Sequence, residues 1–378
     1  MNREEYIKEA KDKFETLLRE QLERADRMKE VPACAGEDGS LDIALVYGDG
    51  IGPYIMKEAE DLLNHVLKDE IGTGKIRLNR IEGLTIENRL EKGESVPGEV
   101  LQELKKCPVI LKGPTATPKG GSMESANVTL RRELDLYANV RPVSIPDKGI
   151  DWTFFRENTE GEYVLGSRGI DLGDLTMDFK VITRPGTERI ARAAFDYASR
   201  NKKNSVSIVT KANIMKKTDG MFSEICHEVA KDYPDIKAED WYVDIMAANL
   251  VNPVIRSDFQ VFVLPNLYGD IITDEAAEIQ GGVGTAGSAN LGDRYAMFEA
   301  IHGTAPRMIE DGLQDYANPT SIFKACEMLL RHIGYVDKAD ILGYAIDKAM
   351  EEGSPVRVTG FSDGATTREL SDYVKKLI

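Results

Sequence analysis

Short apolar runs that alternate with helical segments constrain the fold of this chain most strongly. The runs at residues 41–47, 109–112, 206–209 and 261–264 are each short enough for a buried strand, and turn residues or helical spacing follow them. Alternating strands and helices are typical of an α/β fold with a largely parallel sheet. At 378 residues, of which 42% are hydrophobic, the chain is long enough for two domains with separate cores.

Periodicity predicts the remaining elements. Strands are expected at residues 151–155, 177–183 and 241–244, and helices at 54–67, 125–136, 187–200, 216–232, 321–333 and 338–351. Residues 1–30 carry a narrow apolar stripe at helical spacing, so we expect an appended helix that packs on the body or on a second subunit. Residues 31–40 contain Pro and Gly and are typical of a linker.

Charge and cysteine content exclude several kinds of partner. A net charge of −16 argues against a nucleic-acid or anionic-membrane surface, because both require basic residues. Cys34, Cys107, Cys226 and Cys326 are widely separated, which indicates neither a zinc site nor a disulfide framework. No apolar run approaches the roughly 18 residues that span a membrane, and the first residues lack the apolar core of a signal peptide. We therefore expect a cytoplasmic protein with reduced thiols.

The segment after the run at 261–264 places two acidic residues on one helical face. A strand that ends at Pro265 and turns at Gly269 into a helix would set Asp270 and Asp274 four residues apart. Two such carboxylates suit Mg²⁺ or Mn²⁺. Acidic residues at a helix start also cap free N–H groups and complement the helix dipole. From this segment alone, capping is the favoured interpretation.

The glycine turn after the first strand has a structural interpretation. Gly48, Gly50 and Gly52 alternate as G-x-G-x-G, which differs from the G-x-G-x-x-G fingerprint of dinucleotide-binding Rossmann folds. A backbone turn that needs positive φ, with Pro53 starting the next helix, accounts for the pattern.

Several longer motifs, taken together, resemble one family. They are Gly48-Asp-Gly-Ile-Gly-Pro53, Lys112-Gly-Pro114, Leu134-Asp-Leu-Tyr-Ala-Asn-Val-Arg-Pro142, Phe155-Arg-Glu-Asn-Thr-Glu160, Asn266-Leu-Tyr-Gly-Asp270 and Glu299-Ala-Ile-His-Gly-Thr-Ala-Pro306. In this order they resemble the β-decarboxylating dehydrogenases, which include isocitrate, homoisocitrate and 3-isopropylmalate dehydrogenases. The resemblance runs from about residue 41 to the end of the chain and leaves the N-terminal helix outside it.

The resemblance implies a two-domain α/β fold that is not a Rossmann fold, with a mixed, largely parallel sheet in the large domain. Residues 41–136 plus 284–378 would form the large, cofactor-binding domain, and residues 137–283 the small domain for substrate, metal and dimer contacts. Residues 1–40 would be a helical extension and linker. The active site of this family is shared between two subunits, so a homodimer or a higher oligomer is expected.

Residue roles follow from the resemblance where the motifs match. Arg131, Arg141 and Arg156 look like substrate-carboxylate arginines, a task that suits bidentate guanidinium groups. Tyr163 and Lys211 look like the catalytic pair. Asp270 and Asp274 look like metal ligands from one subunit, with Asp244 and Lys211 contributed by the other. The residues that look like the cofactor-binding set are Lys112, Thr117, Asn213, Glu299, His302, Gly303, Thr304, Ala305 and Asn318.

The start of the helix at 125–136 indicates the substrate. Ser125 and Asn127 resemble the isocitrate-specific members, in which a hydroxyl and an amide meet a third carboxylate of the substrate. Ser125 would also suit a plain N-cap. The resemblance implies conversion of isocitrate to 2-oxoglutarate and CO₂, a tricarboxylic acid cycle reaction, with homoisocitrate or 3-isopropylmalate as alternatives. A rival of another class is a non-catalytic regulatory subunit, but such subunits tend to lose residues that are all present here.

The cofactor expectation is NAD, with NADP as the alternative. Arg307 could meet a 2′-phosphate, whereas Asp311 or Asp315 could reach the ribose hydroxyls. The stretch at residues 360–367 resembles the NAD-using members, because it lacks the tyrosine and arginine that help hold the phosphate.

Overall fold

Two compact units make up the chain in the computed structural model, which describes residues 3–28, 39–118, 123–166, 168–282 and 286–378. The first unit comprises Met1–Ala33 with Ser144–Thr273, and the second comprises Cys34–Val143 with Asp274–Ile378. The domain ranges expected from the sequence stay a prediction. Their junction at 283–284 and most of the expected linker lie outside the described residues.

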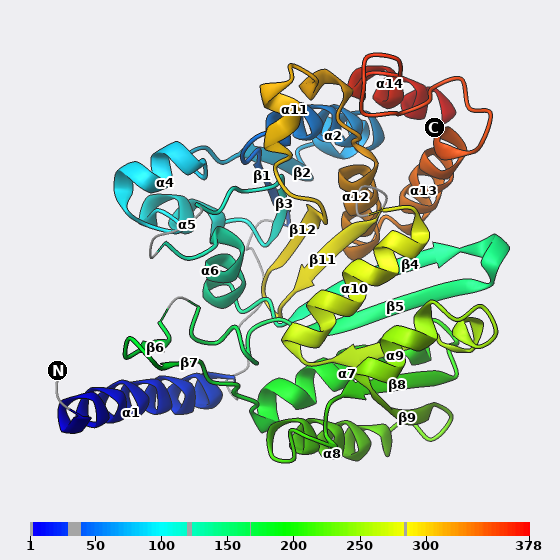
Figure 1. The fold of residues 1–378 in the computed structure, drawn as a ribbon. Helices are drawn as coiled ribbons and strands as arrows, with labels where there is room; N and C mark the ends of the chain where they lie inside the picture. Colours follow the sequence, from blue (N-terminus) through cyan, green and yellow to red (C-terminus); the bar gives the residue numbers. More distant parts are fainter. Residues whose placement is uncertain (1–2, 29–38, 119–122, 167, 283–285) are drawn as a thin grey trace. The chain divides into compact units, whose positions relative to one another are not determined.

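The second unit is built on a mixed sheet (Figure 1). Its neighbouring strands are, in order, β2 (Ile76–Arg80), β1 (Leu41–Val46), β3 (Val109–Lys112), β12 (Ala296–Ala300), β11 (Gly287–Leu291) and β4 (Ala138–Ile145), whose last two residues belong to the first unit. β1 is parallel to β2 and β3, and β12 is parallel to β3. β11 is antiparallel to β12 and to β4. The expected α/β fold with a mixed, largely parallel sheet is confirmed.

Helices connect these strands because parallel neighbours need a crossover connection. The helices between strands are α2 (Gly52–Val66), α3 (Lys68–Gly72), α4 (Ile86–Lys92), α5 (Gly98–Leu104) and α6 (Ala126–Glu133). The helices that follow β12, the last strand, are α11 (Pro306–Glu310), α12 (Thr320–His332), α13 (Val336–Met350) and α14 (Thr367–Leu377). α12 packs on β3, β11 and β12, and α14 packs on α2 and α13. All four residues of β3 are buried, as expected for a strand covered on both faces.

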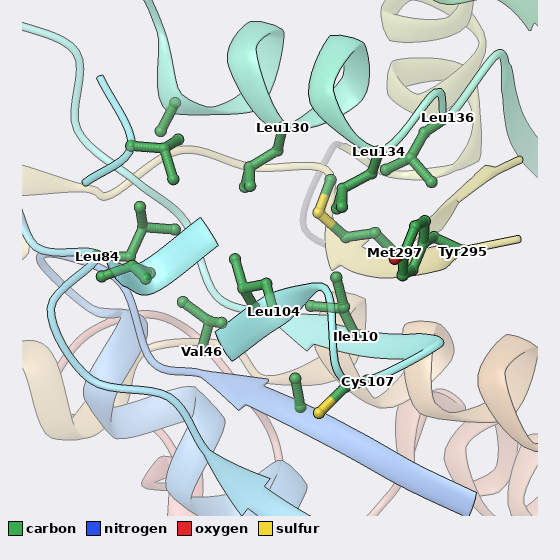
Figure 2. Packing of buried hydrophobic residues seen from close by; sticks show 14 residues of the cluster. Val46, Leu84, Leu104, Cys107, Ile110, Leu130, Leu134, Leu136, Tyr295 and Met297 are labelled. Carbon is green, nitrogen blue, oxygen red and sulfur yellow. The ribbon is translucent and has the colours of Figure 1, made fainter. Parts of the chain in front are cut away.

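An apolar cluster holds α5 and α6 against the sheet of the second unit (Figure 2). Leu104 of α5 and Leu130 of α6 share this cluster with Val46, Ile110 and Met297 from three different strands, and all five are buried. Truncation of a leucine in such a core to alanine typically costs about 2–5 kcal/mol. The cluster therefore fixes α6, the helix whose first residues resemble a substrate-selecting segment.

The first unit contains a parallel set of strands. Their order is β5 (Ile150–Glu157), β10 (Val261–Leu264), β8 (Ser205–Thr210) and β9 (Lys237–Tyr242). The other elements of this unit are α1 (Arg3–Arg27), the paired β6 (Ile170–Asp171) and β7 (Thr176–Met177), α7 (Arg184–Arg200), α8 (Thr218–Ala230), α9 (Val243–Leu250) and α10 (Asn266–Gln280), whose last turns belong to the second unit.

Aromatic side chains form the centre of the first unit. The rings of Phe154 and Phe262 stack with centroids 4.3 Å apart, and Trp152 meets both rings edge-on. These contacts join β5 to β10, the strand that leads into α10. Aromatic pairs of this kind add roughly 0.5–1.5 kcal/mol each beyond the burial of their area.

Two predicted strands have the wrong bounds. Within 177–183 the paired strand ends at Met177, because the polar Lys180 turns inward to Asp219 and Glu162 instead of continuing an alternating ladder. Within 241–244 the strand ends at Tyr242, and Asp244 lies in the first turn of α9. Backbone pairing with β8 begins at residue 237, earlier than the apolar pattern indicates.

The cysteines that the structure describes are buried free thiols. Burial raises the pKa of Cys107, Cys226 and Cys326 above the ordinary value. Cys34 lies outside the described residues. None of the helices, as far as the chain is described, is long and apolar enough to cross a membrane.

Candidate active site

The glycine turn fixes two loops of the second unit. Gly48 and Gly50 have φ of +72° and +60°, and a Cβ on Gly50 would lie 2.1 Å from the carbonyl oxygen of Thr304. The buried carboxylate of Asp49 accepts hydrogen bonds from the backbone of Ile86 at 2.8 Å and Ala116 at 2.7 Å. The structural interpretation of the turn is confirmed, because it holds the loops that carry Thr117 and Thr304.

A buried charged cluster lies where β3 and β12 end. Lys112 Nζ is 3.3 Å from Glu299 Oε2, and Arg131 Nη2 donates to Glu299 Oε1 at 3.2 Å. Asn290 Nδ2 donates to the same carboxylate at 2.8 Å. Burial alone would raise the pKa of Glu299, but Lys112 and Arg131 outweigh it and lower the pKa to about 2. Burial also lowers the pKa of Lys112, whose side chain has no solvent contact.

The residues expected to select the substrate lie at the start and along the first turns of α6. Ser125 occupies the N-cap position of α6, but its side chain makes no capping hydrogen bond. Asn127 Oδ1 accepts a hydrogen bond from Thr115 at 3.2 Å. The buried Nε of Arg131 has no hydrogen-bond partner among the described residues. Plain capping therefore does not explain Ser125, and an unpartnered buried guanidinium donor suits an anionic ligand.

The loop that follows β12 contains the expected nucleotide-binding residues. His302 Nδ1 lies 3.0 Å from the carbonyl oxygen of Gly303, and its buried Nε2 has no partner in the described part of the chain. Burial lowers the pKa of His302. Ala305 has φ of +46° at the start of α11. Asn318 Oδ1 accepts from the backbone and hydroxyl of Thr320, which holds the start of α12.

One assembly in the first unit joins β5 to α10. The buried Arg156 donates to Asn266 Oδ1 from Nε at 2.9 Å and from Nη2 at 2.7 Å, and its Nη1 pairs with Asp270. Tyr163 donates its hydroxyl to Asp270 Oδ2 at 2.7 Å. Gly269 makes room for this arrangement, because a Cβ there would lie 2.5 Å from Arg156 Cγ. A predicted substrate arginine, the predicted catalytic tyrosine and a predicted metal ligand thus meet at one carboxylate.

A second pair in the first unit lies at the ends of β8 and β9. Lys211 Nζ pairs with Asp244 Oδ1, and this hydrogen bond lowers the pKa of the Asp244 carboxyl. The backbone N–H of Lys211 donates to the buried Asp219 at 2.7 Å. Asn213 follows in an exposed turn. The structure therefore brings the two residues that the resemblance assigns to one subunit together as an ion pair.

Helix α10 carries both of the acidic residues, Asp270 and Asp274, that are expected to bind a metal from one subunit. The helix begins at Asn266 with no acidic residue in its first turn, so capping does not explain Asp270 or Asp274. Asp274 pairs with Arg141 in the second unit at 2.7 Å and keeps 59% of its side chain exposed. Two hard oxygen ligands on one helical face fit a divalent cation such as Mg²⁺ or Mn²⁺. Within the described single chain, no group of three or more acidic, His or Cys side chains is arranged to hold a metal.

The isocitrate/isopropylmalate dehydrogenase family model matches residues 42–374. The chain belongs to this family. Isocitrate dehydrogenase (NADP) of Rickettsia bellii is 40% identical over 349 residues, which cover 88% of this chain and 69% of the relative. Subunit 2 of the mitochondrial isocitrate dehydrogenase (NAD) of Schizosaccharomyces pombe is 35% identical over 347 residues, with 89% and 87% covered. For further Rickettsia relatives, the aligned region spans 63% of their length.

A solved structure supports the family fold. The crystal structure of isocitrate dehydrogenase from Methylococcus capsulatus matches with a TM-score of 0.78 at 34% identity, covering 89% of this chain and 99% of that one. The two-domain isocitrate/isopropylmalate dehydrogenase-like fold predicted from the motifs is thus confirmed. The N-terminal helix lies outside the region that the family model matches.

Sequence reasoning missed several residues that shape the site of this family member. Asn266 was part of a quoted motif, yet its link to Arg156 depends on a contact across 110 residues. Asp49 was treated only as part of a glycine turn, although its place between two glycines is a signal for a buried loop anchor. Lys180 and Asp219 form a buried pair at 2.5 Å, and no local pattern marks either residue.

Proposed function

We propose that the protein catalyses metal-dependent oxidative decarboxylation of isocitrate to 2-oxoglutarate and CO₂ with reduction of NAD(P). The observation that carries the proposal is the assembly in which Arg156 and Tyr163 both bind Asp270. It places a carboxylate-binding cation, a proton donor and a hard oxygen ligand around one point. Family membership is the second support.

Substrate binding rests on local positive charge in an acidic protein. Arg131, Arg141 and Arg156 supply guanidinium groups that suit carboxylates, and Arg131 retains an unpartnered buried Nε among the described residues. Asn127 lies one turn before Arg131 on α6 and offers an amide, and Ser125, the N-cap residue of α6, offers a hydroxyl. This polar set favours the third carboxylate of isocitrate over the isopropyl group of 3-isopropylmalate. Homoisocitrate, which has one more methylene, is the second candidate substrate.

Tyr163 and Lys211 would transfer the protons in this reaction. Lys211 would help remove the proton of the substrate hydroxyl, and Tyr163 would later protonate the carbon that loses CO₂. Asp244, Asp270 and Asp274 would hold Mg²⁺ or Mn²⁺, which polarises the substrate oxygens and stabilises negative charge that develops on them. The described residues of one chain hold no group of three acidic, His or Cys side chains arranged for a metal. We therefore propose that a second copy of the chain contributes Lys211 and Asp244, so that the active form is a homodimer or a larger assembly.

The cofactor would lie against the loop at residues 302–305 and the buried cluster of Lys112 and Glu299. The unpartnered Nε2 of His302 in the described structure suits a nucleotide ligand. The resemblance favours NAD, whereas the Rickettsia bellii relative is named for NADP and the Schizosaccharomyces pombe relative for NAD. We therefore propose NAD(P), and kinetics must decide between the two.

The test mixes the full chain with Mn²⁺, one of isocitrate, homoisocitrate or 3-isopropylmalate, and either NAD or NADP. Absorbance of the reduced nicotinamide is followed with and without a chelator. We expect chelator-sensitive reduction that is fastest with isocitrate. The proposal would be contradicted if none of the substrates led to reduction of the nicotinamide, or if reduction persisted in full with chelator.

Two variants sharpen this test. Ser125→Leu should lower kcat/KM for isocitrate far more than for 3-isopropylmalate, because it replaces a polar contact with an apolar one. Asp235→Asn, which changes an exposed aspartate, is the matched control and should leave both values unchanged.

A further inference from the structure

Helix α1 lies outside the family match and packs on the first unit. Leu17 is 6% exposed and shares an apolar cluster with Val164 and Leu165. The ring of Phe14 lies 5.4 Å from that of Phe179. Figure 1 shows α1 running beside β6 and β7. The helix therefore covers the segment that carries Tyr163, the residue immediately before this cluster.

Arg24 links α1 to the same segment by charge. Its Nη2 donates to Glu160 Oε1 at 2.7 Å, and its Nη1 donates to the carbonyl oxygen of Thr159 at 2.9 Å. The Glu160 side chain is fully buried and that of Arg24 is 14% exposed. A buried carboxylate needs such a partner, since an isolated buried charge is strongly disfavoured.

Glu160 is held from a second side by α7. The backbone N–H of Thr183, the N-cap residue of α7, donates to Glu160 Oε2 at 2.8 Å, and its hydroxyl donates to Oε1. A Cβ on Gly186 would lie 2.3 Å from Glu160 Oε1, so the glycine provides the space for the carboxylate. Glu160 is thus a junction between α1, α7 and the strand end of β5.

The junction continues into the site assembly. The carbonyl oxygen of Glu160 accepts a hydrogen bond from Asn266 Nδ2 at 3.0 Å, and Asn266 in turn accepts both bonds from Arg156. Gly161, at φ of +76°, turns the chain so that Tyr163 reaches Asp270. Only two residues thus separate Glu160, whose carboxylate is anchored, from Tyr163, the proposed proton donor.

We propose that α1 is a positioning element in which Arg24 fixes the segment at residues 157–165 and thereby orients Tyr163 for proton transfer. Arg24 touches neither substrate nor cofactor in this arrangement, so it acts through Glu160. The effect on turnover rests on the proposed function, whereas the effect on the segment itself does not. Misplacement of a catalytic group by about 1 Å can lower the rate by as much as about a hundredfold.

The test compares Arg24→Met with Arg24→Lys and with Arg19→Met. Arg19 lies on the same helix, pairs with Glu15 one turn away and has 72% of its side chain exposed, so its variant is the matched control. Amide hydrogen exchange at residues 157–165 should be faster in Arg24→Met than in wild type. It should return towards the wild-type rate in Arg24→Lys and equal that rate in Arg19→Met. This readout needs no activity and separates failure of the inference from failure of the proposed function.

Kinetics supply the second readout. In Arg24→Met we expect kcat to fall roughly tenfold while KM for the substrate changes less than about threefold. The solvent deuterium isotope effect on kcat should rise, because delivery of a proton by Tyr163 becomes slower. Arg24→Lys should recover most of kcat, since an ammonium also neutralises Glu160.

Two outcomes would overturn the inference. One is wild-type exchange at residues 157–165 together with wild-type kcat in Arg24→Met. The other is faster exchange spread evenly over β1, β3 and β12, which would show that Arg24 supports general stability and does not position the segment.

Discussion

Replacement of Glu299 by glutamine tests the buried charged cluster of the second unit. The change keeps the size of the side chain and removes the negative charge between Lys112 and Arg131. We expect the free energy of unfolding at neutral pH to fall, because both cations lose their counter-charge in a site closed to solvent.

The lowered pKa of Glu299 gives the size of the expected loss in the free energy of unfolding. It is lowered from 4.5 to about 2, and a shift of about 2.5 units corresponds to about 3 kcal/mol. Burial lowers the pKa of Lys112 at the same time, so this value is an upper bound on the net contribution of the pair. Because the folded-state pKa lies below the unfolded value, the stabilisation is complete above about pH 5 and falls to about 1 kcal/mol at pH 3.

The assay is denaturant unfolding of wild type and Glu299→Gln at pH 7, 5 and 3. Glu103→Gln is the matched control, because Glu103 forms an exposed pair with Lys106 that contributes less than about 1 kcal/mol. The reasoning is refuted if Glu299→Gln is as stable as wild type at pH 7, or if the difference stays constant down to pH 3.

Three further predictions concern the glycine turn, a proposed metal ligand and α1. Gly50→Ala should destabilise by roughly 2 kcal/mol more than Gly74→Ala in thermal unfolding, since both have positive φ but only Gly50 would place a Cβ against backbone; equal losses would contradict this. Asp270→Asn should lower turnover by more than about a hundredfold with unchanged circular dichroism, because an amide is a poorer ligand for a hard cation, and retained activity would remove the metal assignment. Arg24→Met should destabilise more at pH 8 than at pH 6. Burial and a neighbouring glutamate raise the pKa of Glu160 to about 7, so the wild-type protein loses stability as the pH rises to about 7 and no further above it. Loss of the guanidinium raises the pKa of Glu160 again, so the variant continues to lose stability above pH 7. A pH-independent loss would contradict the last prediction.

Local pattern was sufficient for much of the fold. The runs at 109–112 and 261–264 coincide with β3 and β10, because a fully buried strand is a continuous apolar stretch. The run at 241–244 gave the wrong bounds for β9, because this strand has no fully buried position and begins at the charged Lys237. Its strand character comes from pairing with β8, which the sequence of β9 alone does not encode.

The candidate site divides in the same way. The sequence motifs shared with the family predicted roles for Arg156, Tyr163 and Asp270, and the structure brings these three residues together. The hydrogen bond from Arg24 to Glu160 joins residues 136 positions apart, and no periodic pattern in the sequence predicts such a contact. Helix spacing placed Asp270 and Asp274 on one face but favoured capping, because the pattern did not fix that α10 begins a full turn earlier, at Asn266.

The burial of the described cysteines gives the protein three internal reporters of motion. Cys107 and Cys326 lie in the second unit and Cys226 in the first, and each has a raised pKa that keeps the thiol protonated. A thiol in this state reacts with an alkylating reagent only when its surroundings open. Labelling rates at the three sites, read by mass spectrometry, would therefore give the local opening free energy of each unit without an added probe.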